Sequence, residues 1–113
     1  MPSDECWLVS AGHVLASAER ARSRESRARG LLGRDGIGGA LVLSPCRSVH
    51  TIGMRFPIDV AYLDEQGFVL KVAHMHRNRI GLPVWKATSV VEAEAGAFER
   101  WGLQVGQQVE VRE

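Results

Sequence analysis

The feature that most constrains the fold is a strand–turn–strand pattern in the middle of the chain. Residues 58–63 read IDVAYL, a run rich in β-branched and aromatic side chains, which favour a half-buried strand. Residues 64–67, DEQG, form a turn signal with Gly67 where a positive φ is needed. Residues 68–76, FVLKVAHMH, read as a second strand. The pattern predicts a β-hairpin in a fold that is mainly β.

Asp59 interrupts the apolar row of the first hairpin strand. Strand alternation puts it on one face with Ala61 and Leu63. A fully buried carboxylate loses hydration at a cost of roughly several kcal/mol unless hydrogen bonds or an opposite charge compensate. We expect the partners in residues 50–55, where Gly53 lets the backbone turn its amides towards Asp59. Asp59 is then either a structural anchor for this loop or a functional carboxylate.

Two histidines lie near the end of the second hairpin strand. His74 and His76 leave the same face of the strand, roughly 6 to 7 Å apart. If the turn pairs Leu63 with Phe68, the histidines share the face of Asp59, whereas a one-residue bulge would turn them to the opposite face. Their placement therefore depends on the register of the hairpin.

A metal site is one interpretation of these side chains. Thiolates and imidazoles are zinc ligands, and the chain offers four candidates in this region, although their spacings match no compact ligand motif. The candidate ligands are Cys46, His50, His74 and His76. The alternative is that the two strand histidines form a solvated strand end.

Length and composition indicate a single domain with one core. The chain has 113 residues, of which 45% are hydrophobic, so we expect one domain over residues 1–113 with its core in about 7–111. A net charge of +1 gives no general attraction to nucleic acid or membrane. No apolar run approaches the roughly 20 residues that cross a bilayer. With only Cys6 and Cys46 and no signal-peptide pattern, we expect a cytoplasmic protein, and the sequence requires no cofactor.

The rest of the chain predicts short strands and one or two short helices. In the strand over residues 88–94, we expect the alternation to turn Glu92 and Glu94 towards water. The further elements expected are a hairpin over residues 7–16 turning at Gly12, a helix in the latter half of residues 17–34, a buried strand over 40–43, one or two helical turns over 95–101 and a closing strand over 107–111.

The one concentrated positive segment runs from Arg20 to Arg34 and holds six arginines. Arginine binds phosphate and carboxylate through a planar fork, so Arg27, Arg29 and Arg34 are candidate anion ligands. The segment has no aromatic side chain for base stacking, which counts against RNA binding. Solvated arginines whose stems cover the sheet are the alternative interpretation.

Two common nucleotide-binding motifs are absent, and a cysteine-based catalytic site is incomplete. The glycines of residues 36–39 are followed by neither the helix of a dinucleotide fingerprint nor a Gly-Lys-Ser/Thr ending, which excludes those nucleotide-binding motifs. Cys46 with His50 as base is a possible nucleophile, but such a thiol needs a lowered pKa and an orienting group. A structural thiol is the other interpretation of Cys46.

Three functional hypotheses follow. The first is a non-enzymatic binding or accessory module that recognises a small polar or anionic ligand, a peptide or a protein partner at the loop from Cys46 to Arg55. Its candidate ligand-binding residues are His50, Thr51, Met54, Arg55 and Asp59. The second is a metal-dependent or cysteine-based hydrolase that uses Cys46, His50 and Asp59. The third, weaker hypothesis is RNA binding through Arg20 to Arg34.

The chain carries an ordered series of short motifs from Trp7 to Val111. The motifs are RGLLGR at 29–34, HTIGM at 50–54, PIDV at 57–60, DEQG at 64–67 with Val69, Val91-Glu92, Ala95-Gly96, and Gly102-Leu103 with Gly106 and Val109. This series resembles the bacterial and archaeal domain of unknown function 192 family. Many members of that family carry Trp-Met-Lys-Asn-Thr before the Ile/Leu-Asp strand, where this chain has residues 50–55, HTIGMR. The resemblance implies a compact β-sandwich or barrel-like domain of α+β class, mainly β, with no assigned activity.

Overall fold

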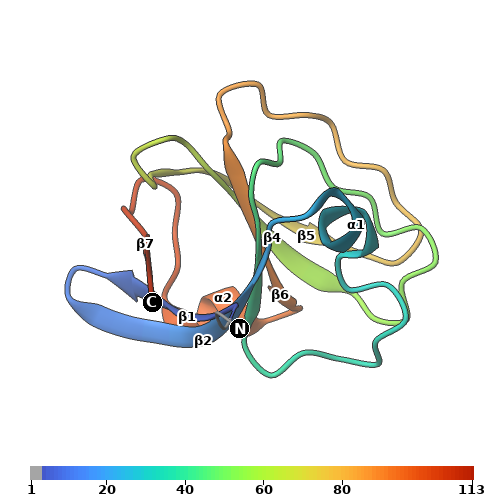
Figure 1. Ribbon diagram of the computed structural model, residues 1–113, viewed down its shortest axis with the longest axis horizontal. Coiled ribbons are helices and arrows are strands. Elements are labelled where there is room, and N and C mark those ends of the chain that lie inside the picture. The colour runs from blue at the N-terminus through green and yellow to red at the C-terminus, as the bar shows by residue number, and fades with distance from the viewer. Residues whose placement is uncertain (1–3) are drawn as a thin grey trace.

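The computed structural model describes residues 4–113, which form seven strands and two short helices (Figure 1). All neighbouring strands pair antiparallel except β2 and β3, which run parallel. The strands make one sheet in the order β5-β4-β6-β3-β2-β1-β7. The elements are β1 (Glu5–Ser10), β2 (His13–Ala21), α1 (Arg24–Arg29), β3 (Ala40–Leu43), β4 (Ile58–Leu63), β5 (Val69–Met75), β6 (Ser89–Glu94), α2 (Ala97–Trp101) and β7 (Glu110–Arg112).

The sheet is open, with β5 and β7 as its two edges. These edges approach each other through an isolated antiparallel bridge between Phe68 and Gln108. The backbone amide of Val109 also donates to the carbonyl of Gly67 at 2.8 Å. The predicted α+β, mainly β fold is confirmed, and its barrel-like form is an open sheet whose edges meet near one turn, not a closed barrel.

Side chains pack against both faces of the central strands. On one face, α2 covers a cluster that includes Ala61, Leu63, Val91 and Phe98. On the other face lies a second cluster, formed by Leu31, Val49, Met54, Val60, Tyr62 and Val90, among others. Because successive residues of a strand point to opposite faces, β4 supplies both clusters and every one of its six residues is buried.

The central hairpin forms as expected, and the structure decides the register that the sequence left open. Asp64 Oδ1 accepts hydrogen bonds from the backbone amides of Gln66 and Phe68, which fixes the turn. Leu63 pairs with Val69 and not with Phe68, and a bulge lies between Tyr62 and Leu63. Together these displace the register by two residues, so the strand histidines still share the face of Asp59.

Two element boundaries differ from the prediction. Strand β2 continues to Ala21 because its second half pairs in parallel with β3, so α1 begins only at Arg24. Ser23 is its N-cap, and its hydroxyl accepts from the amide of Ser26 at 3.0 Å. The closing strand, expected over 107–111, is β7, three residues long.

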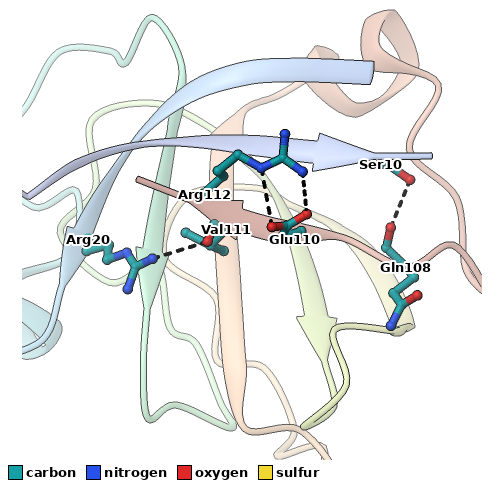
Figure 2. Close-up of polar contacts among 6 residues, drawn as sticks. All are labelled: Ser10, Arg20, Gln108, Glu110, Val111 and Arg112. Carbon is teal, nitrogen blue, oxygen red and sulfur yellow. Dashed lines mark hydrogen bonds and ion pairs between the residues drawn. The ribbon is translucent and has the colours of Figure 1, made fainter. Parts of the chain in front are cut away.

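Side-chain contacts hold β7 and the segment before it in place (Figure 2). Ser10 Oγ donates to the carbonyl of Gln108 at 2.9 Å, and Arg20 Nη2 donates to the carbonyl of Val111 at 3.3 Å. The Arg20 side chain is only 24% exposed. The first residue of the arginine-rich segment therefore stabilises the C-terminal strand.

We predict that Gly67→Ala destabilises the fold by about 2 to 4 kcal/mol. Gly67 has a φ of 86°, and a Cβ there would overlap the carbonyl oxygen of Val109, so backbone strain and steric overlap add. Gly12→Ala is the matched control: its φ is 79° but no atom lies within 4 Å of the added Cβ, so a cost of about 1 kcal/mol is expected. Urea denaturation measures both, and equal costs would contradict the close contact between the turn and Val109.

Candidate functional site

A pocket of about 320 Å³ lies between α1 and the loop over residues 45–54. It brings together two segments that the sequence singled out separately, the arginine-rich segment and the loop beginning at Cys46. Its floor is formed by apolar side chains of the second cluster and by Glu92 of β6. The polar and sulfur-containing lining side chains are Arg24, Arg27, Arg29, Cys46, Ser48, His50, Met54 and Glu92.

The arginines of α1 supply positive charge to this pocket. Arg29 is exposed, and its guanidinium makes no hydrogen bond or ion pair within residues 4–113. Arg27 is half-buried and donates to the carbonyl of Arg22. The third predicted anion ligand, Arg34, does not line this pocket. It forms a two-point ion pair with Glu19 at 2.8 and 3.3 Å, and the hydrogen bond to Glu19 raises the pKa of Arg34.

Cys46 lies in the pocket as a neutral thiol. Its Sγ donates to the carbonyl of Ser48 at 3.2 Å. Burial raises the pKa of the Cys46 thiol above its ordinary value; the carboxyl group of Glu92 also raises it, and the guanidinium of Arg27 lowers it. Because the thiolate is the nucleophile, a raised pKa makes this sulfur a weak one.

Thr51 serves the architecture of the loop. The residue is completely buried, and its hydroxyl donates to the carbonyl of His76 at 2.6 Å and accepts from the amide of Arg79 at 2.9 Å. An isolated antiparallel β-bridge between His50 and Ile80 joins the same two segments of the chain. These bonds hold the connection between β3 and β4 beside the connection between β5 and β6 (Figure 1). The hydroxyl of Thr51 is thus already used inside the protein.

The other loop candidates differ in their exposure. Met54 is buried and lines the pocket, whereas His50 is exposed at its edge. Arg55 is exposed and pairs with the exposed carboxylate of Asp35 at 3.0 Å. Exposed pairs of this kind contribute little to stability, typically about 0 to 1 kcal/mol.

Asp59 lies on the opposite face of the sheet, under α2. Its side-chain oxygen Oδ2 accepts from the backbone amides of Gly96 at 2.9 Å and Phe98 at 3.2 Å. Its Oδ1 lies 3.1 Å from Nδ1 of His74. Gly96 is the N-cap of α2 and has no side chain to cap it, so Asp59 performs that function from β4. The expectation that residues 50–55 supply its partners is therefore wrong: Asp59 anchors α2, not the loop.

The predicted metal ligands do not come together. His74 and His76 are exposed on the α2 face, with ring centroids 5.0 Å apart at a right angle. Cys46 and His50 line the pocket on the other face. Among the residues from 4 to 113, no group of three or more histidine, cysteine, aspartate or glutamate side chains is arranged to hold a metal ion.

Glu92 is the site residue that the sequence analysis missed. The prediction that it faces water is wrong, because α1 and the loop over 45–54 cover its face and leave it 5% exposed. It lies between Leu41 of β3 and Val60 of β4, and burial raises its pKa to about 7. Within residues 4–113 its carboxyl group makes no hydrogen bond or ion pair. Val90, on the same face, was the available sign that this face is not fully polar.

Comparison with known proteins supplies the family. The sequence profile of domain of unknown function 192 (DUF192, uncharacterized ACR) matches residues 7–111. The chain belongs to the DUF192 family. The resemblance drawn from the sequence motifs is thereby confirmed over the same residues. A search of the curated proteins found no match to this DUF192 domain.

Two solved structures share the fold of this DUF192 domain. One is a protein of unknown function from Novosphingobium aromaticivorans, with a TM-score of 0.76, 21% identity, and coverage of 94% of this chain and 83% of that one. The other, from Sinorhizobium meliloti, is described as a "putative transcription regulator"; its TM-score is 0.79, its identity 17%, and coverage is 98% and 97%. At these identities the likeness concerns the fold alone.

Neither helix within residues 4–113 has the length and apolar character needed to span a membrane.

We predict that Asp59→Ala lowers the stability of this DUF192 domain by about 2 to 4 kcal/mol, because it removes the cap of α2 and leaves two amides without an acceptor. His74→Ala removes only the half-exposed partner of the same carboxylate and should cost less than about 1 kcal/mol. Chemical denaturation measures both variants. Equal losses would show that the histidine contact, and not the helix cap, accounts for the role of Asp59.

We predict that Glu92 makes the domain less stable as the pH rises from about 4.5 to about 7. The folded state binds the Glu92 proton more tightly than the unfolded chain does, so this contribution is present below the ordinary pKa of 4.5 and is lost as the pH passes about 7. Glu92→Gln should match the parent near pH 4.5 and exceed its stability by up to about 3 kcal/mol at pH 8.

Glu65→Gln is the control for this experiment, because Glu65 is exposed in the hairpin turn. Denaturation at several pH values measures the stability difference between each variant and the parent. A difference for Glu92→Gln that stays constant across the window, or one that Glu65→Gln reproduces, would contradict the buried position of Glu92.

Proposed function

We propose that this DUF192 domain is a non-enzymatic binding module that holds a small polar or anionic ligand in the pocket between α1 and residues 45–54. The observation that supports this most directly is that the positively charged helix and the Cys46 loop, which are distant in the sequence, line the same pocket. A volume of about 320 Å³ lies at the lower end of the range for ligand pockets and suits a small molecule or the end of a peptide.

The proposed anion contacts are the guanidinium groups of Arg27 and Arg29. Arginine donates two parallel hydrogen bonds to a carboxylate or phosphate, and such charge-assisted bonds are stronger than neutral ones. His50 and Met54 complete the ligand-binding set on the loop side. Thr51, Arg55 and Asp59 drop out of it, because the first is engaged inside the protein, the second pairs at the surface and the third caps α2.

The alternative of a hydrolase has less support from the geometry. Its three proposed residues are Cys46, His50 and Asp59, but Asp59 is bonded to α2 on the far face of the sheet. The raised pKa of the Cys46 thiol is the reverse of what a cysteine nucleophile needs.

The RNA-binding alternative also has less support. It needs a row of available arginines, but Arg20 holds β7, Arg22 pairs with Glu113 at 3.0 Å and Arg34 pairs with Glu19. The remaining arginines of the segment surround a small pocket.

We further propose that the module works in the cytoplasm, since Cys6 and Cys46 are both free thiols and a reducing compartment would keep them so.

Titration of the isotope-labelled domain with inorganic phosphate and with butyrate tests this function. We expect amide shifts to concentrate at Gly30, Cys46 and His50, which line the pocket. Arg29→Ala should weaken binding about tenfold, because it removes a charge-assisted contact of about 1.5 kcal/mol. Arg100→Ala, on the exposed side of α2, is the control and should bind like the parent. Shifts confined to another face, or no binding of either probe, would overturn the proposal.

A further inference from the structure

The carboxyl group of Glu92 is buried in the pocket floor without a partner. The residue is 5% exposed, and within residues 4–113 it forms no hydrogen bond or ion pair. A Cβ placed at Gly30 would lie 3.4 Å from its Oε1, so the carboxyl group sits directly beneath the end of α1. A buried acid is stable as an anion only when an opposite charge or several donors face it. Residues 4–113 provide neither.

Positive and negative charge occupy different ends of this pocket. Arg29 is exposed on α1, whereas Glu92 belongs to β6, which lies between β3 and β4 in the sheet. Both Arg27 and Glu92 act on the thiol of Cys46, in opposite directions. No ion pair joins Glu92 to an arginine in the part of the chain that the structure describes. The pocket is therefore dipolar, with a cationic rim and an acidic floor.

We propose that the ligand of this pocket is a small zwitterion, whose anionic group binds Arg27 and Arg29 at the rim and whose ammonium group binds Glu92 at the floor. This inference rests on the proposed binding function and names the chemical class of its ligand. A ligand with only an anionic group would leave the floor carboxyl group unpaired. A ligand ammonium supplies both the opposite charge and up to three N–H donors.

The other groups around the pocket do not fill this role. The thiol proton of Cys46 is directed to the carbonyl of Ser48. The hydroxyl of Tyr62 lies near Gly81, where an added Cβ would be 3.3 Å from it. The charged or titratable side chains that face the pocket from all the elements around it are Arg24, Arg27, Arg29, Cys46, His50 and Glu92, with Tyr62 close enough to Glu92 for the acid to help raise its pKa.

A series of ω-amino carboxylates from glycine to 6-aminohexanoate tests the inference, because chain length sets the distance between the two charges. Each member is compared by calorimetry with the carboxylate of the same length that lacks the amine. We expect one length to bind at least tenfold more tightly than its matched carboxylate. Glu92→Gln should remove that advantage without weakening the matched carboxylate, whereas Arg29→Ala should weaken both ligands.

The two proposals fail in different ways in this experiment. Equal binding of amino carboxylates and carboxylates at every length would overturn the zwitterion and leave the anion-binding module standing. An advantage that persists in Glu92→Gln would also overturn the assignment of the floor. If no member of either series binds, the binding function and the inference fall together.

Proton release gives an independent readout of the ammonium contact. Burial raises the pKa of Glu92 to about 7, so the acid is partly protonated near neutral pH, and an ammonium binds its anionic form more tightly than its neutral form. Calorimetry at pH 7 in two buffers of different ionisation enthalpy should show release of a fraction of a proton with the best amino carboxylate and none in Glu92→Gln. Release of the same size in the variant would assign the proton to another group, such as His50, and would contradict the proposed contact.

Discussion

The structure depends on the burial of its central strands from both sides. Strands β4 and β6 lie next to each other, and α2 covers one face of them while α1 and the Cys46 loop cover the other. Each side chain of these strands therefore packs into one of two apolar environments. An acidic side chain there needs a hydrogen-bond or ion-pair partner, or has to line a cavity. Two buried acids occupy these strands: Asp59 in β4, and Glu92 one position away from it on the neighbouring strand, facing the opposite side. They meet the same physical demand in different ways.

Asp59 is satisfied within the protein. It accepts from two amides at the start of α2, where the helix has a glycine cap and no side chain of its own to offer. The chain enters α2 directly from the end of β6, so the acid on β4 sits in the right place because β4 and β6 pair. His74 adds a contact at the exposed edge strand. This acid belongs to the architecture, because its contacts fix α2 to β4.

The carboxyl group of Glu92, unlike that of Asp59, has no hydrogen-bond or ion-pair partner within residues 4–113. The helix that covers it has arginines, but their guanidinium groups stay near the surface or bond to backbone carbonyls, and burial raises the pKa of the acid to about 7. A leucine or a glutamine in that position would give a higher free energy of unfolding than the buried acid does. Binding sites often contain an acid whose burial lowers the stability of the protein but whose charge can pair with a ligand. Membership of an uncharacterised family and the likeness to two distant structures establish the fold, and the pocket beneath α1 is our proposal for the location of its function.

The sequence by itself determined the hairpin of β4 and β5, the strand at Ala40–Leu43, the mainly β class and the family, because alternation, turn residues and motif order are local properties of the chain. It also singled out Arg27, Arg29, Cys46 and His50. Only the tertiary structure decided that these four line one pocket, that Asp59 faces α2, and that Glu92 is buried. The reason is that a strand pattern gives the two faces of a strand but not what covers each one. That depends on where a helix and a loop from elsewhere in the chain pack, and the solvation of an acid depends on that packing.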